Sequence, residues 1–222
     1  MDATVNTSVR DRTFLNNGFS SKQIRLFLLR HGQTEANVAQ INQGHLPGKL
    51  SPLGEQQAQQ IAERLRPEKF DIIIVSDLRR AKQTAAPIIA THPEAKVIYE
   101  PRIRERNQGV FEGKPIGSFQ DHAARLGVDV VTFQPEGGES IAMMQGRAAR
   151  FFDDLVKEHK SKTVLVVSHG GFLTQLLFML LKKENTRENY EGLQPMNCAL
   201  SVFSIKDDGN HEVELVNCVE HL

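Results

Sequence analysis

The feature that most constrains this chain is the alternation of short apolar runs with segments of helical periodicity. Three runs, residues 24–29, 70–75 and 163–167, are rich in leucine, isoleucine and valine. Such runs are typical of strands buried on both faces of a sheet. Over residues 141–155, apolar side chains recur at spacings of three and four, which predicts an amphipathic helix. The alternation predicts an α/β fold of three layers, α/β/α, with a mostly parallel central sheet.

Weaker signals complete this outline. Ser51 followed by Pro52 predicts the start of a helix whose buried face includes Leu53, with the neighbouring glutamines, Gln57 among them, in solvent. Ser76 and Asp77 stand where the cap of the next helix is expected. Further elements are expected as a strand over 95–99, helices over 116–126 and 172–181, and a hairpin of 199–205 and 212–216 around a turn at 207–210.

The beginning of the chain lacks this regularity. Residues 1–22 mix polar side chains with scattered apolar ones, which predicts a loosely held arm. The remaining length, residues 23–222, is typical of one α/β domain with a sizeable core. We therefore expect a single domain over residues 23–222.

Charge and cysteine content limit the partners. The 27 lysines and arginines are balanced by 27 aspartates and glutamates, whereas nucleic acids and anionic membranes favour basic surfaces. Cys198 and Cys218 are too few for a disulfide framework and fit a reducing compartment. The chain has no membrane-spanning run, no secretory signal and no histidine cluster of metal-binding type. We expect a cytoplasmic protein that binds neither nucleic acid nor membrane and needs no metal or cofactor.

Basic side chains and histidines follow the apolar runs at their carboxyl ends. Arg30 and His31 follow the first run, Arg80 lies just beyond the second, and His169 and Gly170 follow the third. Because the carboxyl ends of parallel strands meet at one edge of a sheet, we expect these side chains to lie close together. Arginine supplies fixed charge and histidine a nitrogen that can act as a nucleophile or proton carrier. The group predicts an anion site and favours phosphate as the anion.

Each of these signals also has a purely structural interpretation. Arg30 and His31 could be a basic pair at a strand end, and residues 79–82 could be a solvated helix face. Glu105, between Arg104 and Arg106, is either part of an exposed ion-pair loop or an acid in a polar pocket. Beside a phosphate, such a carboxyl group could protonate the departing oxygen. Convergence at one sheet edge favours the active-site interpretation.

Four segments, in order along the chain, resemble the motifs of the histidine phosphatase superfamily, also called phosphoglycerate mutase-like. These segments are residues 29–37, 76–85, 104–113 and 168–171. The resemblance implies a phosphoglycerate mutase-like fold and metal-independent phosphoryl transfer through a phosphohistidine. Within the superfamily, residues 104–114 and 135–140 are most similar to TIGAR-type fructose-2,6-bisphosphatases.

The resemblance also implies a role for individual residues. His31 would be a neutral nucleophile, His169 would be protonated when a phosphate dianion is bound, and Glu105 would exchange the proton of the leaving alcohol. Phosphate would be bound by Arg30, Asn37, Arg80 and Gly170. Gly44, His45 and Arg104 are candidates for the substrate rim, although pairing of Arg104 and Arg106 with Glu112 or Glu105 is the favoured alternative.

Three functions remain open at this stage. The first is a phosphatase acting on a small phosphorylated metabolite, with fructose 2,6-bisphosphate, cleaved at C2, as one candidate. The second is a phosphoglycerate or bisphosphoglycerate mutase, which must exclude water while its intermediate reorients. The modest region of residues 115–138 favours hydrolysis. The third, an inactive binding or scaffold protein, is disfavoured because the expected chemical groups are all present. We expect a monomer or a weak homo-oligomer.

Overall fold

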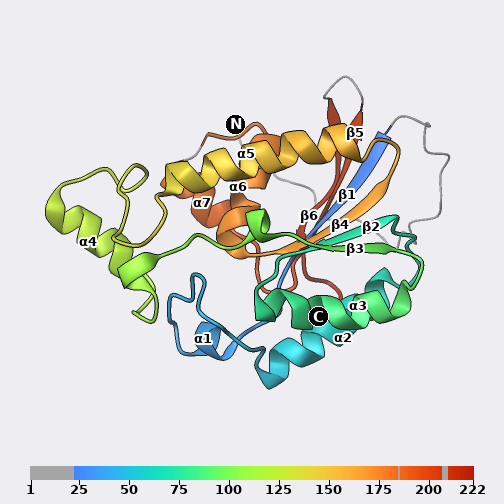
Figure 1. Ribbon diagram of the computed structural model, residues 1–222, viewed down its shortest axis with the longest axis horizontal. Helices are drawn as coiled ribbons and strands as arrows, with labels where there is room; N and C mark the ends of the chain where they lie inside the picture. The colour runs from blue at the N-terminus through green and yellow to red at the C-terminus, as the bar shows by residue number, and fades with distance from the viewer. Residues whose placement is uncertain (1–22, 185, 207–209) are drawn as a thin grey trace, which may run out of the picture.

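The computed structural model describes residues 23–184, 186–206 and 210–222. Its centre is a six-stranded sheet with the strand order β3-β2-β4-β1-β5-β6 (Figure 1). Four strands run parallel: β1 (Gln23–Arg30), β2 (Ile72–Val75), β3 (Lys96–Tyr99) and β4 (Thr163–Ser168). The hairpin strands β5 (Leu200–Lys206) and β6 (His211–Cys218) join them antiparallel at one side. The predicted mostly parallel sheet is confirmed.

Helices cover both faces of this sheet (Figure 1). Leu26, Leu28 and Val164 share one apolar cluster with α5 (Ile141–Glu158) and α6 (Gly170–Leu180). The alternate strand positions, such as Phe27 and Leu165, share a second cluster with α2 (Pro52–Leu65) and α3 (Arg79–Thr91). The central strands are therefore buried on both faces, which explains their continuous apolar sequence.

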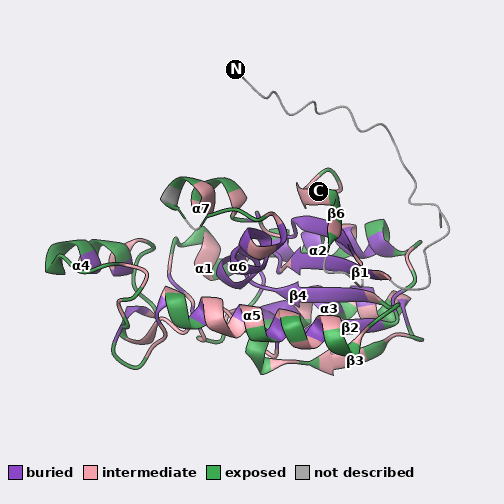
Figure 2. Cartoon of the chain, turned by 90° about the horizontal axis from the view of Figure 1, so that it is seen from above, coloured by how far each residue is buried: buried purple, intermediate pink, exposed green. Residues whose placement is uncertain are grey.

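The remaining helices are short. They are α1 (Glu35–Val38), α4 (Ser118–Leu126), α7 (Arg187–Leu193) and the 3-10 turns η1 (Pro101–Ile103) and η2 (Gly109–Phe111). Figure 2 shows that α4 stands out from the body of the molecule and is largely exposed, whereas β1, β4 and α6 are largely buried. The sequence pattern does not predict α7.

Several local predictions need correction. Leu53 is exposed and Gln57 is buried, because the start of α2 packs against the loop after β1, where Gln57 accepts a hydrogen bond from the Gln33 N–H. The cap at Ser51 is confirmed. In contrast, α3 begins after Leu78 without a side-chain cap, and Ser76 and Asp77 make other contacts, described below.

Other predictions lie outside the described residues or beyond what the structure tests. The predicted arm, residues 1–22, and residues 207–209 of the predicted turn lie outside the described part of the chain. The division into one domain over 23–222 stays a prediction. Within the described residues, no helix is both long enough and apolar enough to cross a membrane.

Candidate active site

Two histidines meet at the carboxyl edge of the sheet. His31 follows β1 and His169 follows β4, and the two strands are neighbours with Arg30 in register with Ser168. The ring centroids of the histidines are 5.1 Å apart, and both side chains are buried, with exposed fractions of 3% and 0%. The sheet topology thus brings together residues that lie far apart in the sequence.

Arg80 joins the two rings. Its Nε–H lies 3.3 Å from Nε2 of His31 and 3.1 Å from Nδ1 of His169. Arginine only donates, so both of these histidine nitrogens accept. The other ring nitrogens donate: Nδ1 of His31 to the Gly32 carbonyl at 2.7 Å, and Nε2 of His169 to Oγ of Ser76 at 2.8 Å. In this arrangement each ring carries one proton, and Nε2 of His31 keeps its lone pair.

Electrostatics supports the neutral state of both rings. Burial lowers the pKa of His31 well below its usual range, and the charges of Arg80 and Arg30 lower it further. Burial and Arg80 also lower the pKa of His169 in the same direction. The neutral nucleophile expected at position 31 agrees with this direction. Protonation of His169 would require the negative charge of a bound dianion to offset these effects.

The two arginines of the site differ in burial, since Arg80 is fully buried and Arg30 is partly exposed. Arg80 is 1% exposed, and burial lowers its pKa to about 10. Arg30 donates through Nη1 to the Pro195 carbonyl at 2.6 Å, while its buried Nε has no hydrogen-bond partner among the described residues. A Cβ atom at Gly170 would lie 3.2 Å from that Nε, so glycine leaves room for the guanidinium group. An unpaired buried N–H is costly, which indicates that an anion belongs here.

Asn37 is held so that its amide nitrogen is available. Its Oδ1 accepts from the Thr34 N–H at 3.1 Å and from Nδ2 of Asn197 at 3.2 Å. The backbone donor at Thr34 sets the orientation of the amide, because only oxygen can accept there. Nδ2 of Asn37 can therefore donate to a ligand.

Glu105 is held by the backbone. Its Oε1 accepts from the Arg106 N–H at 2.8 Å, and its Oε2 accepts from the Gly171 N–H at 2.9 Å, at the start of α6. A Cβ atom at Gly171 would lie 2.4 Å from Oε1 of Glu105, so a larger residue would displace the carboxylate. The carboxyl group thus sits beside the helix that begins directly after His169.

Of the three predicted rim residues, two contact residues of the site and one does not. Gly44 offers its carbonyl to Nη2 of Arg80 at 2.8 Å, and His45 donates from Nε2 to the Glu105 carbonyl at 2.8 Å. Both therefore lie at the site. Arg104 does not join them, because its guanidinium group pairs with Asp77 through bonds of 2.6 and 2.5 Å.

The expected pairing of Arg104 and Arg106 with Glu112 or Glu105 is wrong. Asp77 takes Arg104, and the guanidinium group of Arg106 lies over the Phe119 ring, 3.9 Å from its centroid. Glu112 instead accepts from the His45 N–H at 2.7 Å and from the Gln108 N–H at 3.2 Å, so it connects the loop of Gly44 and His45 to the segment after Glu105.

Two contributing residues were missed by the sequence reasoning. Nδ2 of Asn197 donates both to the His31 carbonyl, at 3.1 Å, and to Asn37. Ser76 supports His169, although its position suggested a helix cap. Asn197 lies in a stretch without regular periodicity, so no local signal pointed to it.

The comparison with known protein families finds a match over most of the chain. The model of the histidine phosphatase superfamily (branch 1) matches residues 26–218, nearly the whole described chain. The chain therefore belongs to the histidine phosphatase superfamily, and the resemblance and fold inferred from its motifs are confirmed.

Individual relatives differ in their named activities. A probable phosphoglycerate mutase GpmB from Yersinia enterocolitica is 36% identical over 182 residues, 80% of this chain and 83% of that protein. The fructose-2,6-bisphosphatase TIGAR of Xenopus tropicalis is 35% identical over 136 residues, 60% of this chain and 50% of that protein. A solved structure of a mycobacterial glucosyl-3-phosphoglycerate phosphatase, complexed with VO3, is 30% identical with a TM-score of 0.73, covering 88% of this chain and 99% of that one.

Proposed function

We propose that this protein is a phosphatase that hydrolyses a small phosphorylated metabolite through a phosphohistidine intermediate. The observation that carries the proposal is the state of His31. Its Nδ1 proton is bound to the Gly32 carbonyl, and its Nε2 accepts from Nε of Arg80 inside the protein, where His31 is 3% exposed. A neutral imidazole with a fixed lone pair, next to the positive charges of Arg80 and Arg30, is suited to attack the phosphorus of a bound phosphate ester.

The remaining residues supply the other parts of the reaction. Nε2 of His31 forms a bond to phosphorus while the bond from phosphorus to the ester oxygen breaks, and Glu105 donates a proton to that oxygen. Glu105 then takes a proton from water as the water oxygen attacks the phosphohistidine. Inorganic phosphate leaves, and His31 and the protonated Glu105 are regenerated.

The phosphoryl oxygens would be bound by four side chains. Arg30 and Arg80 donate charge-assisted hydrogen bonds, Asn37 donates through Nδ2, and His169 stabilises the charge that develops in the transition state. Gly170 provides the space that brings Arg30 close. His169 would take up a proton as the dianion binds, because the anion reverses the local balance of charge.

The nature of the alcohol is the finer part of the proposal. Fructose 2,6-bisphosphate, cleaved at C2, is supported by the similarity to TIGAR, and a phosphorylated glycerate derivative is supported by the mycobacterial phosphatase. A mutase must exclude water while its intermediate reorients. Residues 115–138, the segment expected to cover the site, include only one short helix, α4, which stands away from the sheet (Figure 1), and this favours hydrolysis. Independence of metals, a cytoplasmic location and a monomeric or weakly associated state stay predictions.

A substrate panel in the presence of a chelator tests the proposal. Fructose 2,6-bisphosphate, 2- and 3-phosphoglycerate, other sugar phosphates and p-nitrophenyl phosphate would be assayed for released phosphate and for isomerised product. We expect phosphate release, and a rapid quench with labelled substrate should place acid-labile label on His31 but not on the His31→Ala variant. Interconversion of phosphoglycerates without net phosphate release would instead establish the mutase alternative. Activity without a labelled histidine would rule out the covalent mechanism.

A further inference from the structure

The chain that carries Glu105 is held by side chains rather than by a neighbouring strand. It lies outside the sheet, between η1 and η2. Four consecutive carbonyls, from residue 102 to residue 105, each accept a hydrogen bond from a side chain. The Ser168 hydroxyl donates to the carbonyl of Ile103 at 2.7 Å, and the Arg147 guanidinium group donates to the other three. The position of Glu105 therefore depends on a few donors.

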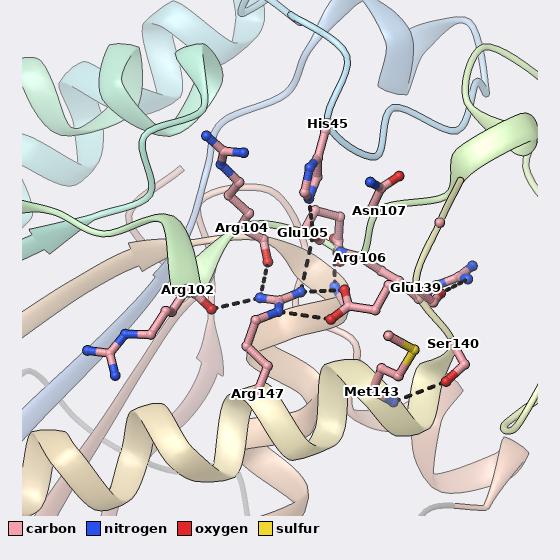
Figure 3. Close-up of polar contacts among 12 residues, drawn as sticks. His45, Arg102, Arg104, Glu105, Arg106, Asn107, Glu139, Ser140, Met143 and Arg147 are labelled. Atoms are coloured by element: carbon pink, nitrogen blue, oxygen red, sulfur yellow. Dashed lines mark hydrogen bonds and ion pairs between the residues drawn. The ribbon is translucent and has the colours of Figure 1, made fainter. Parts of the chain in front are cut away.

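Arg147 is the donor shared by most of these contacts (Figure 3). Its Nη1 lies 2.7 Å from the Arg102 carbonyl and 2.9 Å from the Arg104 carbonyl. Its Nη2 lies 3.4 Å from the Glu105 carbonyl, which His45 also contacts. One planar guanidinium group thus spans the main chain just before the carboxyl group, a geometry that a lysine ammonium cannot reproduce.

Glu139 sets the orientation of Arg147. Its two carboxylate oxygens accept from Nε and Nη2 of Arg147 at 3.0 and 2.6 Å, and both side chains are largely buried, with exposed fractions of 17% and 15%. Such a bidentate pair fixes the plane of the guanidinium group. Glu139 is also tied to the segment after Glu105, because its N–H donates to the Asn107 carbonyl at 2.8 Å.

Arg147 also contacts the helix that holds the other end of Glu105. Its guanidinium carbon lies 5.3 Å from the centroid of the Phe172 ring. Phe172 follows Gly171, whose N–H binds the Glu105 carboxylate. Arg147 is therefore placed between the main chain of Glu105 and the start of α6, the two elements whose separation determines where the carboxylate lies.

We propose that Arg147, oriented by Glu139, is a positioning residue that aims the Glu105 carboxyl group at the oxygen of the leaving alcohol. This inference rests on the proposed function, in which Glu105 exchanges a proton with that oxygen. Arg147 itself touches no substrate in this scheme. Its loss leaves His31, Arg80 and the phosphate pocket intact, while the proton donor is displaced.

The Arg147→Lys variant tests this inference with two esters: p-nitrophenyl phosphate, whose leaving group needs little protonation, and the alkyl phosphate of the panel that the wild type hydrolyses fastest. Because Glu105 aids mainly the alkyl ester, we expect kcat for that ester to fall by about ten- to a hundredfold and kcat for p-nitrophenyl phosphate by less than about threefold. Arg150→Lys, an exposed arginine on the same helix, is the matched control and should leave both rates unchanged.

A double variant shows whether Arg147 acts through Glu105. In a Glu105→Gln background, Arg147→Lys should change the alkyl ester rate by less than about twofold, because residues that act as a unit are not additive. An equal loss on both esters in the single variant, or a full further loss in the double variant, would overturn the proposal. Where thermal unfolding shows that Arg147→Lys does not fold, Glu139→Gln is subject to the same criteria, with a smaller loss expected.

Failure of the proposed function would look different. If Glu105→Gln alone slows both esters equally, or if the wild type forms no phosphohistidine, the assigned role of Glu105 or of His31 is wrong. If those experiments succeed and only the Arg147 variant lacks the selective loss, the inference about Arg147 alone is wrong.

Discussion

The two halves of the candidate site are built in different ways. Arg30, His31 and His169 directly follow or end strands of the central sheet, and the neighbouring β2 leads to Ser76 and Arg80. Glu105 lies on irregular chain, whose carbonyls accept from side chains of α5, β4 and residue 45, and its carboxylate accepts from the N–H groups of Arg106 and Gly171. The phosphate half is therefore a product of the sheet, and the leaving-group half is a product of hydrogen bonds from several separate elements.

Because of this difference, the geometry of the phosphate half depends on the stability of the sheet, whereas the geometry of the leaving-group half also depends on individual hydrogen bonds. The phosphate half shares its main chain with the most buried part of the molecule, so its geometry persists as long as the sheet is intact. The leaving-group half depends on a few polar contacts that can be altered without opening the core. Substitutions in the two halves should consequently differ in their dependence on the leaving group. Two predictions address that difference, and a third addresses the stability of the phosphate half.

The largest effect is expected for Glu105→Gln. Removal of the proton donor should slow alkyl phosphate hydrolysis by about three to four decades, the upper part of the range of general acid catalysis, while p-nitrophenyl phosphate is affected far less. Steady-state kinetics with both esters measures the ratio. Glu94→Gln, an exposed carboxylate before β3, is the control. Equal losses on the two esters would mean that the two halves do not divide the reaction as proposed.

Arg80→Met should produce the next largest effect, with the opposite selectivity. Loss of a buried donor to the developing charge typically costs about two to three decades in rate, and both esters should suffer equally because both carry the same phosphoryl group. Arg79→Met is a matched control, since Arg79 is the exposed neighbour on the same helix. A selective loss on the alkyl ester would contradict the assignment of Arg80 to the phosphate half.

The smallest effect concerns stability and pH. The pKa of His169 is lowered well below its usual range by burial and by Arg80, so the unfolded chain binds more protons than the folded one below about pH 6.5. The free energy of unfolding should therefore fall as the pH drops from about 6.5 towards the pKa of the folded state, by up to about 1.4 kcal/mol per unit for this histidine.

Urea unfolding at about pH 7.5 and about pH 5.5 measures this loss. His169→Asn should lose less stability over the interval than the wild type, because the group responsible is gone. His159→Asn, at the end of α5 and away from the site, should show the wild-type loss. Identical pH dependence in the wild type and in His169→Asn would show that burial of this histidine is not the cause.

The phosphate half could be predicted from the sequence because its residues lie close in sequence to the apolar runs that form the strands. Each apolar run is followed by its functional residue, and a parallel sheet aligns the strand ends whatever the loops do. Glu105 could be singled out by its neighbours, but its supports could not. Arg147 lies 42 positions from Glu105 along the chain, on a helix whose periodic pattern describes only its apolar face.

Several other polar contacts could not be predicted because the two partners lie far apart in the sequence. Asp77 pairs with Arg104 across 27 positions, and Asn197 reaches His31 across 166. Charge patterns indicate that an arginine will find an acceptor, but not which one, because surface pairs differ little in energy. The burial of Gln57 likewise follows from a close approach between α2 and the loop after β1.

The sequence by itself thus determined the layers of the fold, the family, and the identity of the residues that meet at the carboxyl edge of the sheet. The layers follow from periodicity, the site residues from their places next to strands, and the family from four motifs that resemble it. Only the tertiary structure decided the proton positions on His31 and His169, the diversion of Arg104 to Asp77, and the support of Glu105 by Arg147. The physical reason is that hydrogen bonds depend on distances of a few tenths of an ångström, which long-range packing sets.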